Sequence, residues 1–162
     1  MARETGRPLP QYGAGTPLPL APPRPAAAPG ESAPAFSLPD LDGRTIDQTA
    51  LRGAATLVLF WNPGCGFCRR MLADLKAWRA DPPPGAPRLL VVSAGTAEAN
   101  RADGLAAPVL LDDSFAVGRA FGATGTPSAV LVDADGRIAS EVAVGGPAVL
   151  ALAGAGAPAG RR

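Results

Sequence analysis

The chain has 162 residues, 47% of them apolar, which suits one domain with a tail. Its formal net charge of +1 gives no sign of a nucleic-acid-binding surface. It has no histidine and two cysteines, which excludes histidine-based catalysis and leaves a four-ligand zinc site possible only across a dimer. We therefore expect no metal and no cofactor.

The first 33 residues are rich in proline, alanine and glycine. This composition buries little apolar surface and favours extended segments, so we predict a disordered tail or linker over residues 1–33. A docking sequence for a proline-binding partner is the alternative. The stretch lacks the apolar core of a signal peptide, and no window of the chain predicts a transmembrane helix. We expect a soluble chain, with processing from a longer precursor left open.

The predicted domain opens with a hairpin. Its strands, 35–38 and 44–46, flank the turn residues 40–43. Asp47 is placed to cap a short helical turn that follows. Residues 55–61 are almost uniformly apolar, which predicts a strand covered on both faces, as in a parallel sheet.

A helix is predicted over residues 65–80, ended by the proline run that begins at Pro82. Its apolar face is expected to comprise Phe67, Met71, Leu75 and Trp78. Residues 88–93 form the next predicted strand. A short helix over 96–100, with an extension to 105 left open, and an extended segment at 108–111 follow.

Asp112 and Asp113 are placed to cap a helix over residues 114–121. An antiparallel hairpin is then predicted, with strands 128–132 and 137–144.

The order of these elements predicts the fold class. A closing helix is expected over residues 147–154. Alternating strands and helices, followed by a hairpin and a helix, indicate an α/β domain over residues 34–155. We expect a mixed central sheet with helices on both faces, and a flexible C-terminus over residues 156–162.

The sequence Cys-Gly-Phe-Cys at 65–68 stands where the predicted strand passes into the helix. Two cysteines three positions apart lie on one side of a first helical turn, within reach of a disulfide. The helix N-terminus favours a thiolate at Cys65, and Arg69 and Arg70 add positive charge if they turn toward it. We predict that Cys65 attacks a substrate disulfide and Cys68 resolves the mixed disulfide. A structural disulfide or two idle thiols is the alternative.

Three segments carry a family resemblance: residues 33–43, 57–68 and 121–133. They are similar to the thioredoxin-fold, TlpA-like and redoxin-type thiol–disulfide oxidoreductases of bacteria. The resemblance implies a thioredoxin-like fold with an N-terminal hairpin and a βα insertion. It implies a cis Pro127 beside the cysteines, where a trans proline opening a strand is the alternative. It also implies that Thr126 offers its backbone to a substrate peptide. Gly66, Phe67 and Trp61 are the further candidate substrate-binding residues, with core packing as the alternative for Trp61.

Several positions depart from the family pattern. Gly64 stands where many members have tryptophan before the first cysteine. Leu59 and Met71 stand where relatives carry a buried carboxylate for proton transfer, and the sequence offers no obvious replacement. We expect Cys68 to exchange its proton with water or with the substrate thiol. The neutral dipeptide between the cysteines predicts a moderately reducing potential.

The resemblance favours an enzyme that acts on protein disulfides or dithiols, together with a further redox partner. We expect a monomer that works outside the cytoplasm, although the chain shows no anchor. A thiol peroxidase is one alternative, but Asn62 stands where peroxiredoxins carry threonine or serine before the cysteine. A thioredoxin-fold binding module without turnover is the other.

Overall fold

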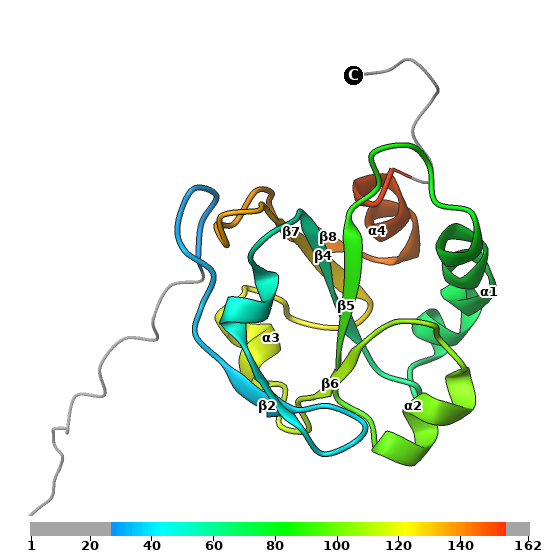
Figure 1. Cartoon of the computed structure of the whole chain (residues 1–162). Coiled ribbons are helices and arrows are strands. Elements are labelled where there is room, and N and C mark those ends of the chain that lie inside the picture. Colours follow the sequence, from blue (N-terminus) through cyan, green and yellow to red (C-terminus); the bar gives the residue numbers. More distant parts are fainter. Residues whose placement is uncertain (1–26, 155–162) are drawn as a thin grey trace, which may run out of the picture.

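The computed structural model describes residues 27–154 (Figure 1). A five-stranded sheet with the strand order β6-β5-β4-β7-β8 forms its centre. The strands are β4 (Thr56–Trp61), β5 (Arg88–Ser93), β6 (Val109–Leu111), β7 (Ser128–Val132) and β8 (Ala143–Val144). The β4, β5 and β6 strands are parallel, whereas β7 is antiparallel to both β4 and β8. The sheet is therefore mixed, as predicted.

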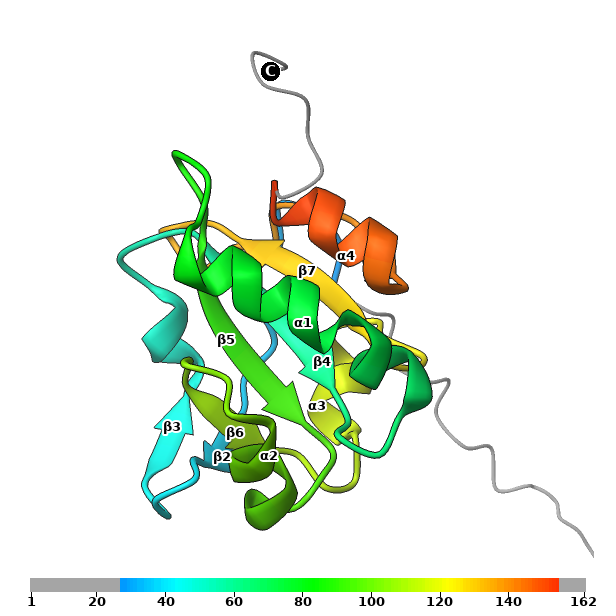
Figure 2. The ribbon, with the colours of Figure 1, turned by 90° about the vertical axis from the view of Figure 1, so that its right-hand side faces the viewer.

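Helices cover both faces of this sheet (Figure 2). The helices α1 (Gly66–Ala80) and α4 (Gly146–Leu152) lie on one face, and α3 (Ala116–Ala120) lies on the other. The helix α2 (Ala97–Asp103) follows β5 at the end of the sheet. Among the described residues, no helix is long and apolar enough to cross a bilayer.

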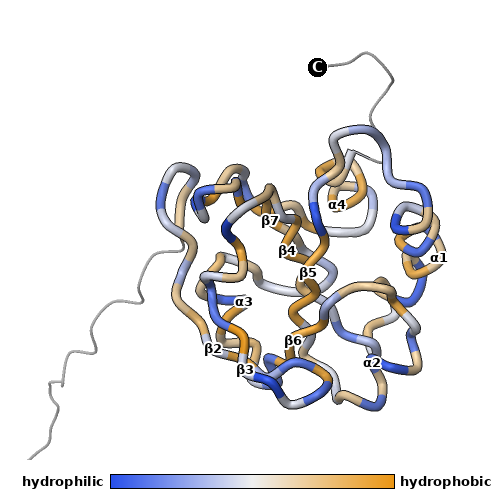
Figure 3. The backbone as a smooth tube through the Cα atoms, viewed as in Figure 1, coloured by the Kyte–Doolittle hydropathy of each residue, from blue (hydrophilic) through white to orange (hydrophobic). Residues whose placement is uncertain are grey.

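The central strand β4 is buried along its whole length, which confirms the prediction of a strand covered on both faces. Because side chains alternate along a strand, Leu57, Leu59 and Trp61 enter the core beneath α1. Val58 and Phe60 enter the core on the α3 side. The hydrophobic colour of the central strands in Figure 3 follows from this double burial.

The N-terminal hairpin is confirmed. Strands β2 (Ser37–Pro39) and β3 (Thr45–Asp47) pair antiparallel. A 3₁₀ helix, η1 (Gln48–Leu51), follows, and the Asp47 carboxylate accepts a hydrogen bond from the Thr49 amide at 2.9 Å, which is the predicted cap.

The domain begins earlier than the sequence predicts. The Gly30 amide donates to the Ile138 carbonyl at 2.8 Å, and the Ala33 amide donates to the Gly136 carbonyl at 2.9 Å. These residues, which composition places in the tail, thus pair with a turn about a hundred residues later. A long-range backbone pairing of this kind leaves no compositional signal. Residues 1–26 of the predicted tail and the predicted flexible C-terminus, residues 156–162, lie outside the described residues.

The predicted apolar face of α1 is wrong at one position. Phe67 is 63% exposed, and the buried face consists of Cys68, Met71, Leu75 and Trp78. Cys68 therefore takes the inward place that the spacing assigned to Phe67.

Two further elements are shorter than predicted. The helix α3 begins at Ala116, and Phe115 rather than an aspartate occupies its N-terminal cap position. The Asp112 carboxylate still accepts from the amides of Val117 at 3.3 Å and Gly118 at 3.0 Å in the first turn. The strand predicted over 137–144 is reduced to β8, with two isolated bridges, one between Val132 and Ile138 and one between Ser32 and Arg137. The ladder is interrupted because the Leu131 amide donates to the Ser140 hydroxyl instead of a backbone carbonyl.

Candidate active site

A tight turn carries the chain from β4 into α1. The Asn62 side-chain oxygen accepts from the Gly64 amide at 2.9 Å, and the Asn62 carbonyl accepts from the Cys65 amide at 2.9 Å. Cys65 is the N-terminal cap of α1, without a side-chain capping bond. The free amides of the first helical turn are thus available to its sulfur, as the sequence predicted.

The two thiols occupy different environments. Both cysteines are free; Cys65 is half-buried and Cys68 is 0% exposed. Partial burial acts to raise the pKa of Cys65, but hydrogen bonds from the Thr126 side chain and from the Cys68 and Phe67 amides outweigh it, and the pKa is lowered. Burial above all raises the pKa of Cys68 to about 11. Cys65 is therefore the more acidic and the more accessible thiol.

The loop before β7 meets the first cysteine. The Thr126–Pro127 peptide bond is cis, as the resemblance implied. The Cys65 thiol donates to the Thr126 carbonyl at 3.5 Å. The Pro127 carbonyl accepts from the Gly145 amide at 2.9 Å, which ties this loop to the start of α4. The fold therefore brings Cys65, Thr126 and Pro127 together from segments about sixty residues apart in sequence.

Exposed apolar side chains lie beside this loop and the cysteines. Gly66 is the first residue of α1 and Phe67 the second. Phe67 borders a groove of about 470 Å³ between α1 and α4, whose lining includes Met71, Pro147 and Leu150. Val144, which pairs with the residue after Pro127, is 62% exposed. Phe67 and Val144 are the exposed large hydrophobic residues of the described region.

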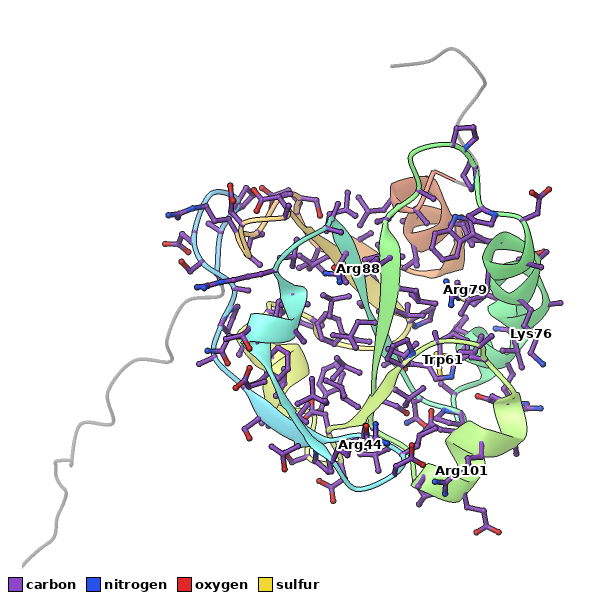
Figure 4. The ribbon with its side chains drawn as sticks, in the orientation of Figure 1. Arg44, Trp61, Lys76, Arg79, Arg88 and Arg101 are labelled. Atoms are coloured by element: carbon purple, nitrogen blue, oxygen red, sulfur yellow. The ribbon has the colours of Figure 1, made fainter. Side chains whose placement is uncertain are left out.

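Trp61 lies in the interior, between the central strands and α1 (Figure 4). Its indole nitrogen donates to a carboxylate oxygen of Asp103 at 3.0 Å. Asp103 is the last residue of α2 and is 5% exposed. The sequence analysis missed this buried carboxylate because α2 is short and polar, and because the contact joins residues 42 positions apart.

The two arginines after the motif turn to partners other than the sulfurs. The Arg69 guanidinium donates to the Pro63 carbonyl at 3.4 Å and lies 3.7 Å from the Asp103 carboxylate. The Arg70 guanidinium stacks over the Phe67 ring, 4.7 Å from its centroid. The conditional expectation that both would turn toward Cys65 is therefore not met.

A thioredoxin-like fold with a CxxC pair at the start of a helix, facing a cis-proline loop, defines the class of thioredoxin-fold thiol–disulfide oxidoreductases. Comparison with known families leads to the same class. The model of the AhpC/TSA family matches residues 29–141, and the chain belongs to this family.

Individual relatives agree with this assignment. The chain is 29% identical to the thiol-disulfide oxidoreductase ResA of Geobacillus thermodenitrificans over 118 residues, which cover 70% of this chain and 68% of the relative. It is 27% identical to ResA of Halalkalibacterium halodurans over 120 residues, which cover 71% and 68%. Among solved structures, the thioredoxin domain of a thiol-disulfide oxidoreductase from Bacteroides vulgatus superimposes with a TM-score of 0.61 at 27% identity, covering 78% of this chain and 96% of that domain.

Proposed function

We propose that the chain exchanges its dithiol with disulfides of protein substrates, with Cys65 as the attacking thiol and Cys68 as the resolving thiol. The observation that carries this proposal is the contrast between the two sulfurs. Cys65 is accessible and its pKa is lowered, whereas Cys68 is buried and its pKa is raised to about 11. Thiolate character and access decide which sulfur attacks first.

The proposed exchange has two steps. The Cys65 thiolate attacks one sulfur of the substrate disulfide, and the other substrate sulfur leaves as a thiolate that takes up a proton. Cys68 then loses its proton and attacks the Cys65 sulfur, which releases the second substrate thiol. The substrate gains two electrons and two protons, and the protein is left with a Cys65–Cys68 disulfide. The reverse sequence oxidises a substrate dithiol.

We further propose that an extended substrate segment lies along Thr126 and Pro127, beside Gly66. The apolar surface of Phe67 and Val144 next to these residues suits a partly unfolded protein chain. We assign Trp61 to support of the active-site turn, because a fully buried indole offers no surface to a substrate.

Trapping with matched cysteine variants tests the proposal. Cys68→Ser is expected to accumulate mixed disulfides with protein substrates, which dithiothreitol releases. Cys65→Ser is the control, since it keeps one thiol but loses the attacking one. Insulin reduction by wild-type protein with dithiothreitol is expected to exceed that by either variant. Equal trapping by the two variants would contradict the assigned roles.

The same experiments separate the alternatives. Thiol peroxidase activity would appear as peroxide consumption by the reduced protein at a rate that Cys65→Ser abolishes. The proposed function does not need that activity, and the Asn62 amide group at the relevant position is engaged by the turn. A binding module without turnover would leave insulin reduction unaccelerated.

We also propose that the protein works as a monomer outside the cytoplasm, with a separate redox partner that restores its dithiol. Its similarity to TlpA-like oxidoreductases supports this placement. Light scattering of the purified chain tests the monomer, and cell fractionation tests the location.

A further inference from the structure

Asp103 is a buried carboxylate close to the active-site turn. One of its oxygens accepts from the Trp61 indole at 3.0 Å, and the other lies 3.7 Å from the Arg69 guanidinium. A buried charge is costly unless it is paired and hydrogen-bonded, and these two partners satisfy that need. Lys76 adds a further positive charge nearby, since its ammonium group lies next to Gly104, the residue after Asp103. The carboxylate thus joins α2 to the end of β4 and the first turn of α1.

Arg69 is placed to influence the attacking sulfur. Its amide donates to the Cys65 carbonyl at 3.0 Å, so the two residues are one helical turn apart on the same side of α1. A cation at that place generally stabilises a thiolate. In this structure, however, the guanidinium is directed to the Pro63 carbonyl and to Asp103, although its side chain is 62% exposed and has room to move.

We propose that Asp103 is a positioning residue that anchors Arg69 at the Pro63 carbonyl and offsets its charge, so that the reactivity of the Cys65 thiol is held below what a free arginine would give it. The inference rests on the proposed role of Cys65 as the attacking thiol. A thiolate that is not over-stabilised favours the disulfide form, so Asp103 keeps the pair reducing.

A double-mutant cycle tests this role. In a Cys68→Ser background, where Cys65 is the one thiol left, thiolate absorbance is followed against pH for Asp103→Asn, Arg69→Gln and the combination. The asparagine keeps the shape of the side chain and can still accept from Trp61, but it loses the charge. We expect Asp103→Asn to lower the Cys65 pKa by roughly 0.5–1, because the guanidinium is then uncompensated but partly screened by solvent.

The double-mutant cycle distinguishes an effect of Asp103 that acts through Arg69 from a general structural effect of the substitution. Asp103→Asn is expected to have no effect on the Cys65 pKa once Arg69 is glutamine, and Asp103→Glu is expected to restore the wild-type value. With the cysteine pair intact, Asp103→Asn is expected to be the more oxidising protein in glutathione buffers. An unchanged pKa in Asp103→Asn, or the same shift with and without Arg69, would overturn the proposal.

Arg69→Gln keeps the test decisive if Asp103→Asn fails to fold. The Arg69 side chain is largely exposed, so its replacement should leave the protein folded. An offset Arg69 contributes little to the thiolate, so the Cys65 pKa is expected to stay nearly constant in this variant. A rise of more than roughly 0.5 would contradict the proposal, since it would show that Arg69 already acts on the sulfur. None of these measurements uses a protein substrate. Failure of the trapping experiment would therefore refute the proposed function alone, and failure of the cycle would refute the role of Asp103 alone.

Discussion

Gly95 lies where the chain leaves β5 and passes beneath the active-site turn, and its replacement by alanine gives a sharp prediction. A Cβ atom at this position would stand 2.6 Å from Pro63 Cδ and 3.0 Å from Pro63 Cγ. Carbon atoms normally approach to about 3.5–4.0 Å, so the proline ring must shift by roughly 1 Å. Overpacking of this kind costs about 1–3 kcal/mol, and here the shift moves the turn that positions Cys65.

We therefore expect Gly95→Ala to lower the free energy of unfolding in urea by about 1–3 kcal/mol and to slow insulin reduction. Gly125→Ala is the matched control for stability, since a Cβ atom there meets nothing within 4 Å. If Gly95→Ala unfolds at the same urea concentration as Gly125→Ala and keeps full activity, the close approach of Gly95 to Pro63 does not position the turn.

Three further predictions concern the side chains around the cysteines. Because the Cys65 pKa is lowered from 9.0, alkylation of Cys68→Ser by iodoacetamide should reach half its maximal rate below pH 9.0. Burial is the largest cause that raises the pKa of Cys68, so Cys65→Ser should need a clearly higher pH, and coincident profiles would contradict the assignment. Trp61→Phe leaves an Asp103 oxygen without its donor, so the free energy of unfolding in urea should fall by about 1–3 kcal/mol. An unchanged free energy of unfolding would mean that this hydrogen bond does not stabilise the fold. Phe67→Ala removes an exposed ring stacked by Arg70, so stability should fall by less than about 1 kcal/mol while the KM for insulin rises; an unchanged KM would argue against substrate binding at this groove.

Local patterns predicted the fold well because the strands and turns carry strong signals. The uniformly apolar β4 and the Asp47 cap were both readable from neighbouring residues. The residue that begins the buried face of α1 could not be read from neighbouring residues in this way. Phe67 and Cys68 are both apolar enough to face the core, and only packing decides between them.

The candidate site divides in the same way. The cysteine pair follows from its spacing, and the cis Pro127 followed from the family resemblance. The buried carboxylate at Asp103 had no sequence signal, because its burial depends on how α2 docks against Trp61. Short helices such as α2 gain their position from tertiary contacts rather than from their own pattern.

The double burial of β4 has a consequence for how this protein can change. The strand β4, which ends at the active-site turn, contributes side chains to two hydrophobic cores, one beneath α1 and one on the α3 side. We therefore expect a cavity opened at Phe60, on the face away from α1, to shift the backbone of β4 and with it the turn before Cys65. Substitutions that adapt either core to temperature will also alter the redox site, so stability and reactivity are expected to evolve together.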